Sequence, residues 1–202
     1  MKTFICTGHA NYGNGTISSA DGTHNGGCNE YLYCAELMTH IKKWLEYAGV
    51  ECDIDTPKEG LLQSLNDEIL YYTTKANAKK YDLVVQLHLN SFNTEATGCE
   101  VWYYKGNECT KTYAKNICSK LSECWINRGA KDSTSLYWLK RTVSPAVLIE
   151  SFFCDNPKDY DTSKKIGMEG HAKLIAEGIV NHKISKKGGK TNGCECGCDC
   201  CK

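Results

Sequence analysis

The sequence predicts a single α/β domain in three layers, with a largely parallel sheet between helices. Short runs of aliphatic and β-branched residues, typical of strands buried on both faces, alternate with longer stretches of helical periodicity. The clearest run covers residues 82–89, and residues 2–7 and 145–149 share its pattern. A chain of 202 residues is long enough to bury a sizeable core.

The first part of the chain gives a strand, a long loop and a helix. Residues 2–7 form the expected first strand, and residues 8–28 are rich in Gly, Asn, Ser and Thr, which indicates a loop. Loops of that length in compact domains are usually functional. Apolar residues then recur at three- and four-residue spacing. Asn29 is a suitable N-cap for this helix and Gly49 a suitable residue to end it.

The middle of the chain continues the alternation. Residues 50–55 read as a second strand, and residues 65–80 as a helix whose apolar positions include Ile69, Leu70 and Ala76. The central strand, residues 82–89, follows directly. This order of strand, helix and strand is that of a parallel βαβ unit.

The last third supplies the remaining elements. Residues 98–104 predict a strand and residues 110–127 an amphipathic helix. Residues 128–141 are mixed and fit either an edge strand or a turn, residues 145–149 form the last buried strand, and residues 167–184 a closing helix.

The domain is expected to end near residue 184. Residues 185–193 are polar and rich in Gly and Lys, as in a linker. Five of the 14 cysteines follow in residues 194–202, where they suit either a soft-metal ligand set or a tail with incidental thiols. The other nine lack the CxxC spacing of a zinc module, so we expect reduced thiols.

Composition excludes several classes of partner. The formal net charge is zero, so no bulk electrostatic attraction to nucleic acid is expected. No apolar run approaches the roughly 20 residues of a membrane span, so we expect no membrane insertion. The chain opens on a short strand instead of a signal-peptide apolar region, which predicts synthesis in the cytoplasm. The oligomeric state does not follow from the sequence.

Three of the buried runs lead into side chains that bind metals or move protons. His9 follows the first strand, His88 lies near the end of the central strand, and Glu150 follows the last one. The carboxyl ends of parallel strands share one edge of a sheet, where α/β folds bind their ligands. A further carboxylate, Glu30, falls in the first turn of the first helix.

These side chains have an ordinary explanation one by one and a chemical one together. A single histidine at a strand end usually makes a structural hydrogen bond, and Glu30 complements a helix dipole. If His9, Glu30 and His88 converge, however, they form the two-imidazole, one-carboxylate ligand set of a catalytic zinc site with an open position for water. Glu150 would then take and return the proton in a metal-assisted amide hydrolysis.

Four separated motifs also resemble one family. They are Thr7-Gly8-His9, Asn29-Glu30, the stretch QLHLNS at residues 86–91 and the stretch PAVLIESFFCDN at residues 145–156. Together they resemble the zinc-dependent N-acetylmuramoyl-L-alanine amidases of the type 3 family. That family includes bacterial autolysins, sporulation amidases and catalytic domains of phage endolysins. The likeness extends from about residue 2 to residue 184.

The resemblance implies a fold, a cofactor and a reaction. It implies a mixed sheet of about six strands and one zinc ion held by His9, Glu30 and His88, with Glu150 as the catalytic carboxylate. The implied substrate is peptidoglycan, cut between N-acetylmuramic acid and the L-alanine of the stem peptide, which would lyse or remodel the cell wall. An enzyme made in the cytoplasm would reach the wall after release, as endolysins do, or by non-classical export.

Details of substrate binding and the class of function stay open at this point. His24 in the long loop, together with Asn90 and Ser91 beyond the central strand, are candidates for substrate contacts. The family usually has glycine where this chain has Ala10 and often arginine where it has Lys75. The alternatives are a zinc carboxypeptidase-like peptidase, a catalytically silent wall-binding domain, and a metal-storage protein built around the tail. The remaining histidines are expected on surfaces or in packing: His40, His171 and His182.

Overall fold

The computed structural model describes residues 1–185, so the predicted cysteine tail and nearly all of the linker lie outside the described residues. The strands are β1 (Lys2–Thr7), β2 (Glu51–Asp55), β3 (Leu83–Asn90), β4 (Cys99–Tyr104), β5 (Asn127–Ser133) and β6 (Ala146–Phe153). The helices are α1 (Glu30–Tyr47), α2 (Leu65–Asn77), α3 (Glu108–Leu121), α4 (Tyr137–Arg141) and α5 (Pro157–Val180), with a short 3-10 turn η1 (Thr23–Asn25).

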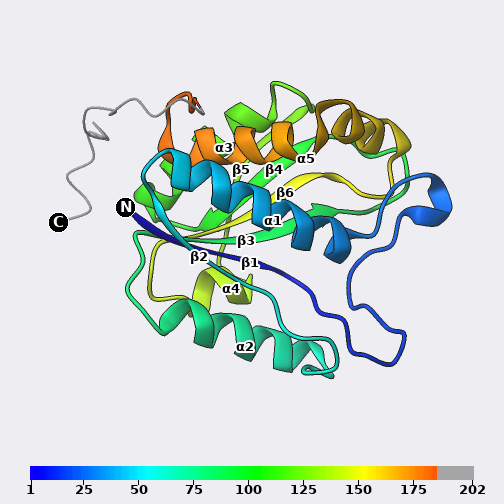
Figure 1. Cartoon of the computed structure of the whole chain (residues 1–202), viewed down its shortest axis with the longest axis horizontal. Helices are drawn as coiled ribbons and strands as arrows, with labels where there is room; N and C mark the ends of the chain where they lie inside the picture. Colours follow the sequence, from blue (N-terminus) through cyan, green and yellow to red (C-terminus); the bar gives the residue numbers. More distant parts are fainter. Residues whose placement is uncertain (186–202) are drawn as a thin grey trace.

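The six strands form one mixed, mostly parallel sheet in the order β2-β1-β3-β6-β4-β5. All neighbouring pairs are parallel except β4 and β6, which run antiparallel. Helices α1, α3 and α5 cover one face of this sheet and α2 and α4 the other (Figure 1). The predicted three-layer α/β class with about six strands is therefore confirmed.

The two faces bury cores of different size. The larger core packs α1, α3 and α5 on the sheet and includes the fully buried Leu37, Ile117 and Ile175. The smaller core lies under α2 and α4 and is centred on Tyr72 and Trp138. The sheet is thus firmly anchored on one side, and the thinner side leaves room for a cavity near the carboxyl ends of the strands.

The structure differs from the sequence prediction in two helices. Helix α5 begins at Pro157 and not at residue 167, because Asn156 caps it and the non-helical Gly167 (φ 67°) only kinks it. The mixed segment after α3 contains both an edge strand, β5, and the short helix α4. In α2, Leu70 was expected on the apolar face but is exposed, whereas Tyr72 and Ala76 are buried.

Register places four residues in one row across the carboxyl half of the sheet. Thr7 pairs with Leu87, so Gly8 follows beside His88, and His88 pairs with Glu150. Glu150 in turn pairs with Glu100 of β4. Residues that are paired across neighbouring strands point to the same face of the sheet, and the strands are about 4.8 Å apart. A register shift between His88 and Asn90 marks the kind of irregularity that often lies beside a site.

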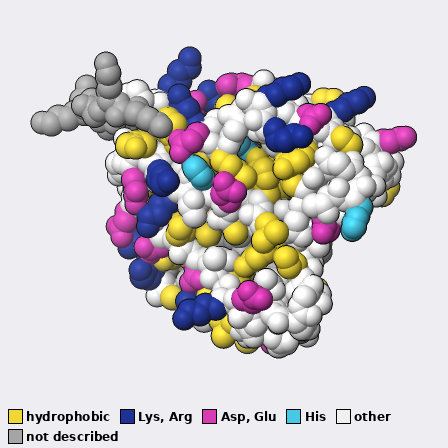
Figure 2. All heavy atoms as spheres, turned by 45° about the vertical axis from the view of Figure 1, so that its right-hand side comes forward, with side chains coloured by type: hydrophobic (Ala, Val, Ile, Leu, Met, Phe, Trp, Pro, Cys, Tyr) yellow, Lys and Arg dark blue, Asp and Glu magenta, His cyan; other side chains and the backbone are white. Residues whose placement is uncertain are grey.

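The surface charges, the cysteines and the apolar content of the helices complete the description of the fold. On the face shown in Figure 2, basic and acidic side chains are interspersed, and hydrophobic side chains gather in the middle of the face. Seven of the nine cysteines within residues 1–185 are buried. Among the helices of this part of the chain, none is both long and apolar enough to span a bilayer.

Candidate metal centre and active site

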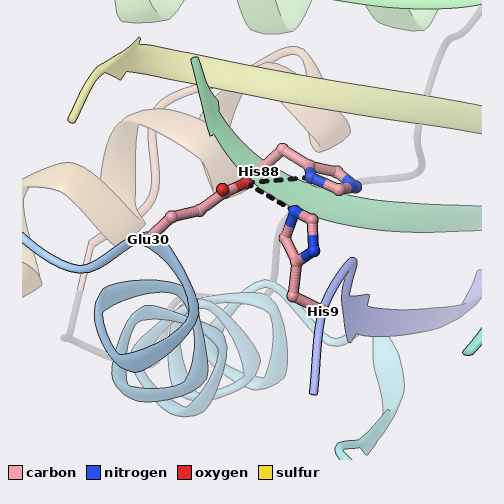
Figure 3. A group of neighbouring side chains, drawn as sticks. All are labelled: His9, Glu30 and His88. Carbon is pink, nitrogen blue, oxygen red and sulfur yellow. Dashed lines mark hydrogen bonds and ion pairs between the residues drawn. The ribbon is translucent and has the colours of Figure 1, made fainter. Parts of the chain in front are cut away.

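His9, Glu30 and His88 converge at the carboxyl edge of the sheet (Figure 3). They come from the residues after β1, the first turn of α1 and β3 respectively. Oε1 of Glu30 lies 2.9 Å from Nδ1 of His88 and 3.3 Å from Nε2 of His9. One ligand atom from each residue lies within 4.8 Å of the others, and within residues 1–185 this is the one such cluster of metal-binding side chains.

Backbone groups hold the Glu30 carboxylate in place. The side chain of Asn29 caps α1 by accepting from the amide of Leu32, so Glu30 lies at the positive end of the helix. Oε1 of Glu30 accepts the amide of Leu89 at 3.1 Å, and Oε2 accepts the amide of Ala20 at 3.1 Å. One oxygen is thus shared with the histidines, and the other anchors the carboxylate to the long loop.

The two histidines are positioned by different means. Nδ1 of His9 lies 3.4 Å from the Ser18 hydroxyl, and the hydroxyl of Tyr72 donates to the His9 carbonyl at 2.6 Å. The ring of His88 lies over Gly8, where a Cβ would come within 1.9 Å of His88 Nε2. The family motif glycine before His9 therefore provides space for the second histidine.

The electrostatics suit a cation. Burial raises the pKa of Glu30, but the two histidines outweigh burial and hold that pKa well below its usual range. Burial lowers the pKa of His88, which favours the neutral imidazole that metals bind. At His9 burial also lowers the pKa, but Glu30 reverses the direction and raises it overall. An ionised carboxylate between two partly buried imidazoles fits a divalent metal such as zinc.

Glu150 lies beside this cluster in a contrasting environment. It pairs with His88 in register, inside β6, since the strand continues to Phe153 past the end that the sequence predicts. Its Oε2 atom is buried and has no hydrogen-bond partner. Burial, followed by the negative charges of Glu30 and Glu100, raises its pKa well above the usual range. A carboxyl group with a raised pKa is suited to taking up and releasing a proton in turn.

Glu100 forms an ion-pair network behind Glu150. Its Oε2 is 2.6 Å from Nζ of Lys131 and 2.7 Å from Nε of Arg128, and its Oε1 accepts from the side chain of Asn90. Burial raises the pKa of Glu100, but Lys131 and Arg128 more than compensate and lower it. Glu100 therefore remains a fixed negative charge next to Glu150.

The candidate substrate residues lie in different surroundings. Asn90 is engaged, since its amide donates to Glu100 and its Oδ1 accepts the amide of Ser91. Ser91 is exposed at the start of the following loop. His24 is an exposed residue of η1 and is not part of the metal cluster. A role in substrate contact stays a prediction for all three.

The other histidines are held elsewhere. His40 is 2.8 Å from Glu169, and His182 is 2.9 Å from the carbonyl of Val180. His171 is fully buried, with Nδ1 2.9 Å from the Tyr33 hydroxyl. Their distribution over surface and packing positions matches the sequence interpretation.

Sequence reasoning missed the residues that support the site. Gly8, Glu68, Tyr72 and Glu100 all lie at or near it. A signal existed for Glu68, because it shares one helix face with the buried Tyr72 and Ala76 at four-residue spacing. Glu100 gave no local signal, because its neighbours on the sheet come from distant segments.

The fold and the site together define an α/β protein with a His-Glu-His candidate metal centre and an adjacent buried carboxyl oxygen of Glu150. A family model described as N-acetylmuramoyl-L-alanine amidase matches residues 3–181. The chain belongs to this family.

Individual relatives agree with this assignment. The solved catalytic domain of CD27L endolysin targeting Clostridia Difficile is 41% identical, with a TM-score of 0.86, over 92% of this chain and 99% of that one. An uncharacterized 38.4 kDa protein of Clostridium perfringens is 29% identical over 92% of this chain and 53% of its own length. The endolysin of Bacillus phage SPP1 is 31% identical over 60% of this chain and 48% of its own. The chain spans about half the length of these curated relatives.

Proposed function

We propose that the chain is a zinc-dependent peptidoglycan amidase that hydrolyses the amide bond between N-acetylmuramic acid and the L-alanine of the stem peptide. The observation that carries the proposal is the convergence of His9, Glu30 and His88 beside a carboxyl group, Glu150, with an unpartnered buried oxygen. Family membership and the relatedness to endolysins support peptidoglycan as the substrate and the cell wall as the place of action.

His9 Nε2, Glu30 Oε1 and His88 Nδ1 would hold one zinc ion, since these are the atoms that face one another. Zinc in such a site acts as a Lewis acid that polarises the amide carbonyl and makes water acidic near neutral pH. The amides of Leu89 and Ala20 fix the Glu30 carboxylate so that its shared oxygen stays aimed at the histidines.

Glu150 moves the protons of the reaction. Its Oε2 atom takes a proton from the attacking water, and the protonated carboxyl group then delivers it to the nitrogen of the departing L-alanine. A raised pKa suits both halves of this role, because the group must be neither a permanent anion nor a permanent acid. Glu100 supports the role by keeping a negative charge beside Glu150.

A digest of purified peptidoglycan by the full chain, followed by mass spectrometry, tests the proposal. The expected products are free stem peptides that begin with L-alanine, lost on treatment with a chelator and restored by zinc. Cleavage within the stem peptide would instead identify a carboxypeptidase-like peptidase. Binding of peptidoglycan without cleavage by the zinc-loaded protein would identify a silent wall-binding domain.

A further inference from the structure

A cavity of about 230 Å³ opens beside the metal cluster on the α2 and α4 side of the sheet. His9 and His88 form part of its wall, so a molecule in the cavity lies next to the candidate catalytic groups. The rest of the wall is largely aliphatic and aromatic, with Ile69 of α2, Leu148 of β6 and Trp138 of α4 among its members. The indole N–H of Trp138 already donates to the carbonyl of Val147, so it has no free donor for a ligand.

One carboxylate interrupts this apolar wall. Glu68 of α2 lines the cavity, and only 1% of its surface is exposed. Neither of its carboxylate oxygens has a hydrogen-bond partner. Burying an ionisable group without a partner costs several kcal/mol in general, so such groups are rare in folded proteins unless a ligand completes them.

Glu68 differs in this respect from the other buried carboxylates of residues 1–185. Each of those five accepts at least one hydrogen bond from the protein: Glu30, Glu100, Asp155, Asp159 and Glu177. The pKa of the Tyr12 phenol is raised, first by burial and second by the nearby Glu68. The two side chains nevertheless make no hydrogen bond of normal geometry. Among the residues that the structure describes, Glu68 is therefore the one carboxylate whose two oxygens are both buried without a hydrogen-bond partner.

Glu68 does not orient the metal ligands either. The second ring nitrogen of His9 faces the Ser18 hydroxyl at 3.4 Å, and the ring of His88 is held between Gly8 and Glu30. Both histidines lie close enough to feel the charge of Glu68, but neither receives a hydrogen bond from it, so the acceptor capacity of its two oxygens is unused within the protein.

We propose that Glu68 is the acceptor of a substrate subsite that takes an N–H donor, an ammonium or amide group, on the peptide part of the muramyl peptide. This inference rests on the proposed amidase function. The two unpartnered oxygens of Glu68 are hydrogen-bond acceptors, so the ligand must bring the donor. The mostly apolar wall, to which Thr73 and Gln86 add polar side chains, suits the aliphatic part of an amino-acid residue better than a sugar ring with its several hydroxyl groups.

Steady-state kinetics of the full, zinc-loaded chain test this subsite. The substrates are a muramyl peptide whose stem carries a side-chain amine and the same peptide with that amine acetylated. We expect Glu68→Gln to raise KM by about tenfold, the worth of one charge-assisted hydrogen bond, with kcat little changed. Asp67→Asn, an exposed neighbour on the same helix, is the matched control and leaves KM unchanged. If Glu68→Gln fails to fold, Glu68→Met offers a similar size without a polar group.

A binding measurement separates this inference from the proposed function. Calorimetric titration of the unacetylated peptide into Glu150→Gln protein, with and without Glu68→Gln, reports the dissociation constant without turnover. A roughly tenfold larger dissociation constant in the double variant supports the subsite. This holds even if the wild-type chain hydrolyses nothing, and in that case only the proposed function fails.

The outcomes are distinct. If acetylation of the substrate raises the wild-type KM as much as the substitution Glu68→Gln raises it, the side-chain ammonium is the donor. Acetylation without effect, while Glu68→Gln still raises KM, identifies a backbone amide. Unchanged KM and unchanged dissociation constant in Glu68→Gln overturn the subsite. Loss of zinc from Glu68→Gln also overturns it, because Glu68 would then support the metal centre.

Discussion

Two glutamates close to each other at the edge of the sheet, Glu30 and Glu150, are in opposite environments. Glu30 is surrounded by donors: two backbone amides and two histidines reach its oxygens. Glu150 has a buried oxygen with no partner, and the nearest charges that act on it are negative. The surroundings lower the pKa of the first carboxyl group and raise that of the second.

This contrast supports the roles that we propose for the two residues. A carboxylate that stays ionised suits a metal ligand, whereas a carboxyl group whose neutral form is stabilised suits proton transfer. Pairs of titratable groups with pKa values pushed apart are a general mark of acid–base sites. The comparison also predicts that similar substitutions at the two positions will have different effects on the metal.

Glu30→Gln gives the largest expected effect. Glutamine keeps the size of the side chain but removes the charge, and its amide nitrogen cannot accept from Leu89 or Ala20. We expect zinc affinity to fall by more than the roughly 100-fold that changes to merely supporting residues cause, with activity lost in parallel. Zinc content measured by mass spectrometry after dialysis checks this. Full zinc occupancy in the variant would break the assignment of Glu30 as a ligand.

Glu150→Gln is expected to abolish turnover while zinc stays bound. General acid–base catalysis is worth about 10²- to 10⁴-fold, so kcat is expected to fall by at least that range. Glutamine keeps the size of the side chain and removes the negative charge that burial disfavours, so the melting temperature of the variant should be no lower than that of the wild type. Loss of zinc together with activity would instead make Glu150 a metal ligand and remove the contrast with Glu30.

Gly8→Ala tests the space that the His88 ring needs. A Cβ at residue 8 would lie 1.8 Å from Cε1 of His88, so the ring must move. We expect a roughly 10- to 100-fold loss of zinc affinity in an otherwise folded protein. Gly170→Ala in α5 is the matched control, because its Cβ would lie 3.3 Å from the side chain of Ile166, away from the site. Equal zinc affinities in the two variants would contradict the steric role of Gly8.

The convergence of His9, Glu30 and His88 could be predicted from sequence because each residue follows a strong local pattern. His88 lies in a buried strand, His9 follows another, and Glu30 follows an N-cap. The predicted fold therefore also predicted where these side chains would lie. Glu100 follows no such pattern, and the pattern at Glu68, its four-residue spacing to Tyr72 and Ala76, is offset by its polar sequence neighbours. A glutamate next to the exposed Asn66 and Asp67 reads as a solvent-facing residue, and only the packing of α2 on the sheet buries it.

The start of α5 was predicted wrongly for a related reason. Gly167, with φ 67°, interrupts the helix, and the turns before it carry mostly polar residues. The apolar periodicity therefore becomes visible only after the kink, and the sequence suggests a start there. The true start depends on Asn156, which caps the helix, and on Asp159, whose carboxylate accepts the amides of Gly98 and Phe153. Such long-range contacts leave no mark in the local sequence pattern.

His171 is a second test of what burial does to a titratable group. It is fully buried and lies outside the metal cluster. Its Nε2 atom has no partner, and burial lowers its pKa to about 3. In the unfolded chain its ordinary pKa is 6.5, so below that pH the unfolded state binds a proton that the folded state refuses. This site's contribution to stability is therefore present above about pH 6.5 and is lost as the pH falls toward 3.

The variant His171→Asn removes this titration and keeps a polar atom near the Tyr33 hydroxyl. From these pKa values, His171 lowers the free energy of unfolding by about 2 kcal/mol between pH 7 and pH 5. Denaturant unfolding at the two pH values should show that the wild type loses about this much more than the variant, whatever their difference at pH 7. Equal losses would mean that His171 gains a proton or a partner in the folded state. That result would also weaken the argument that burial raises the pKa of Glu150, because both arguments depend on the cost of burying a charged group.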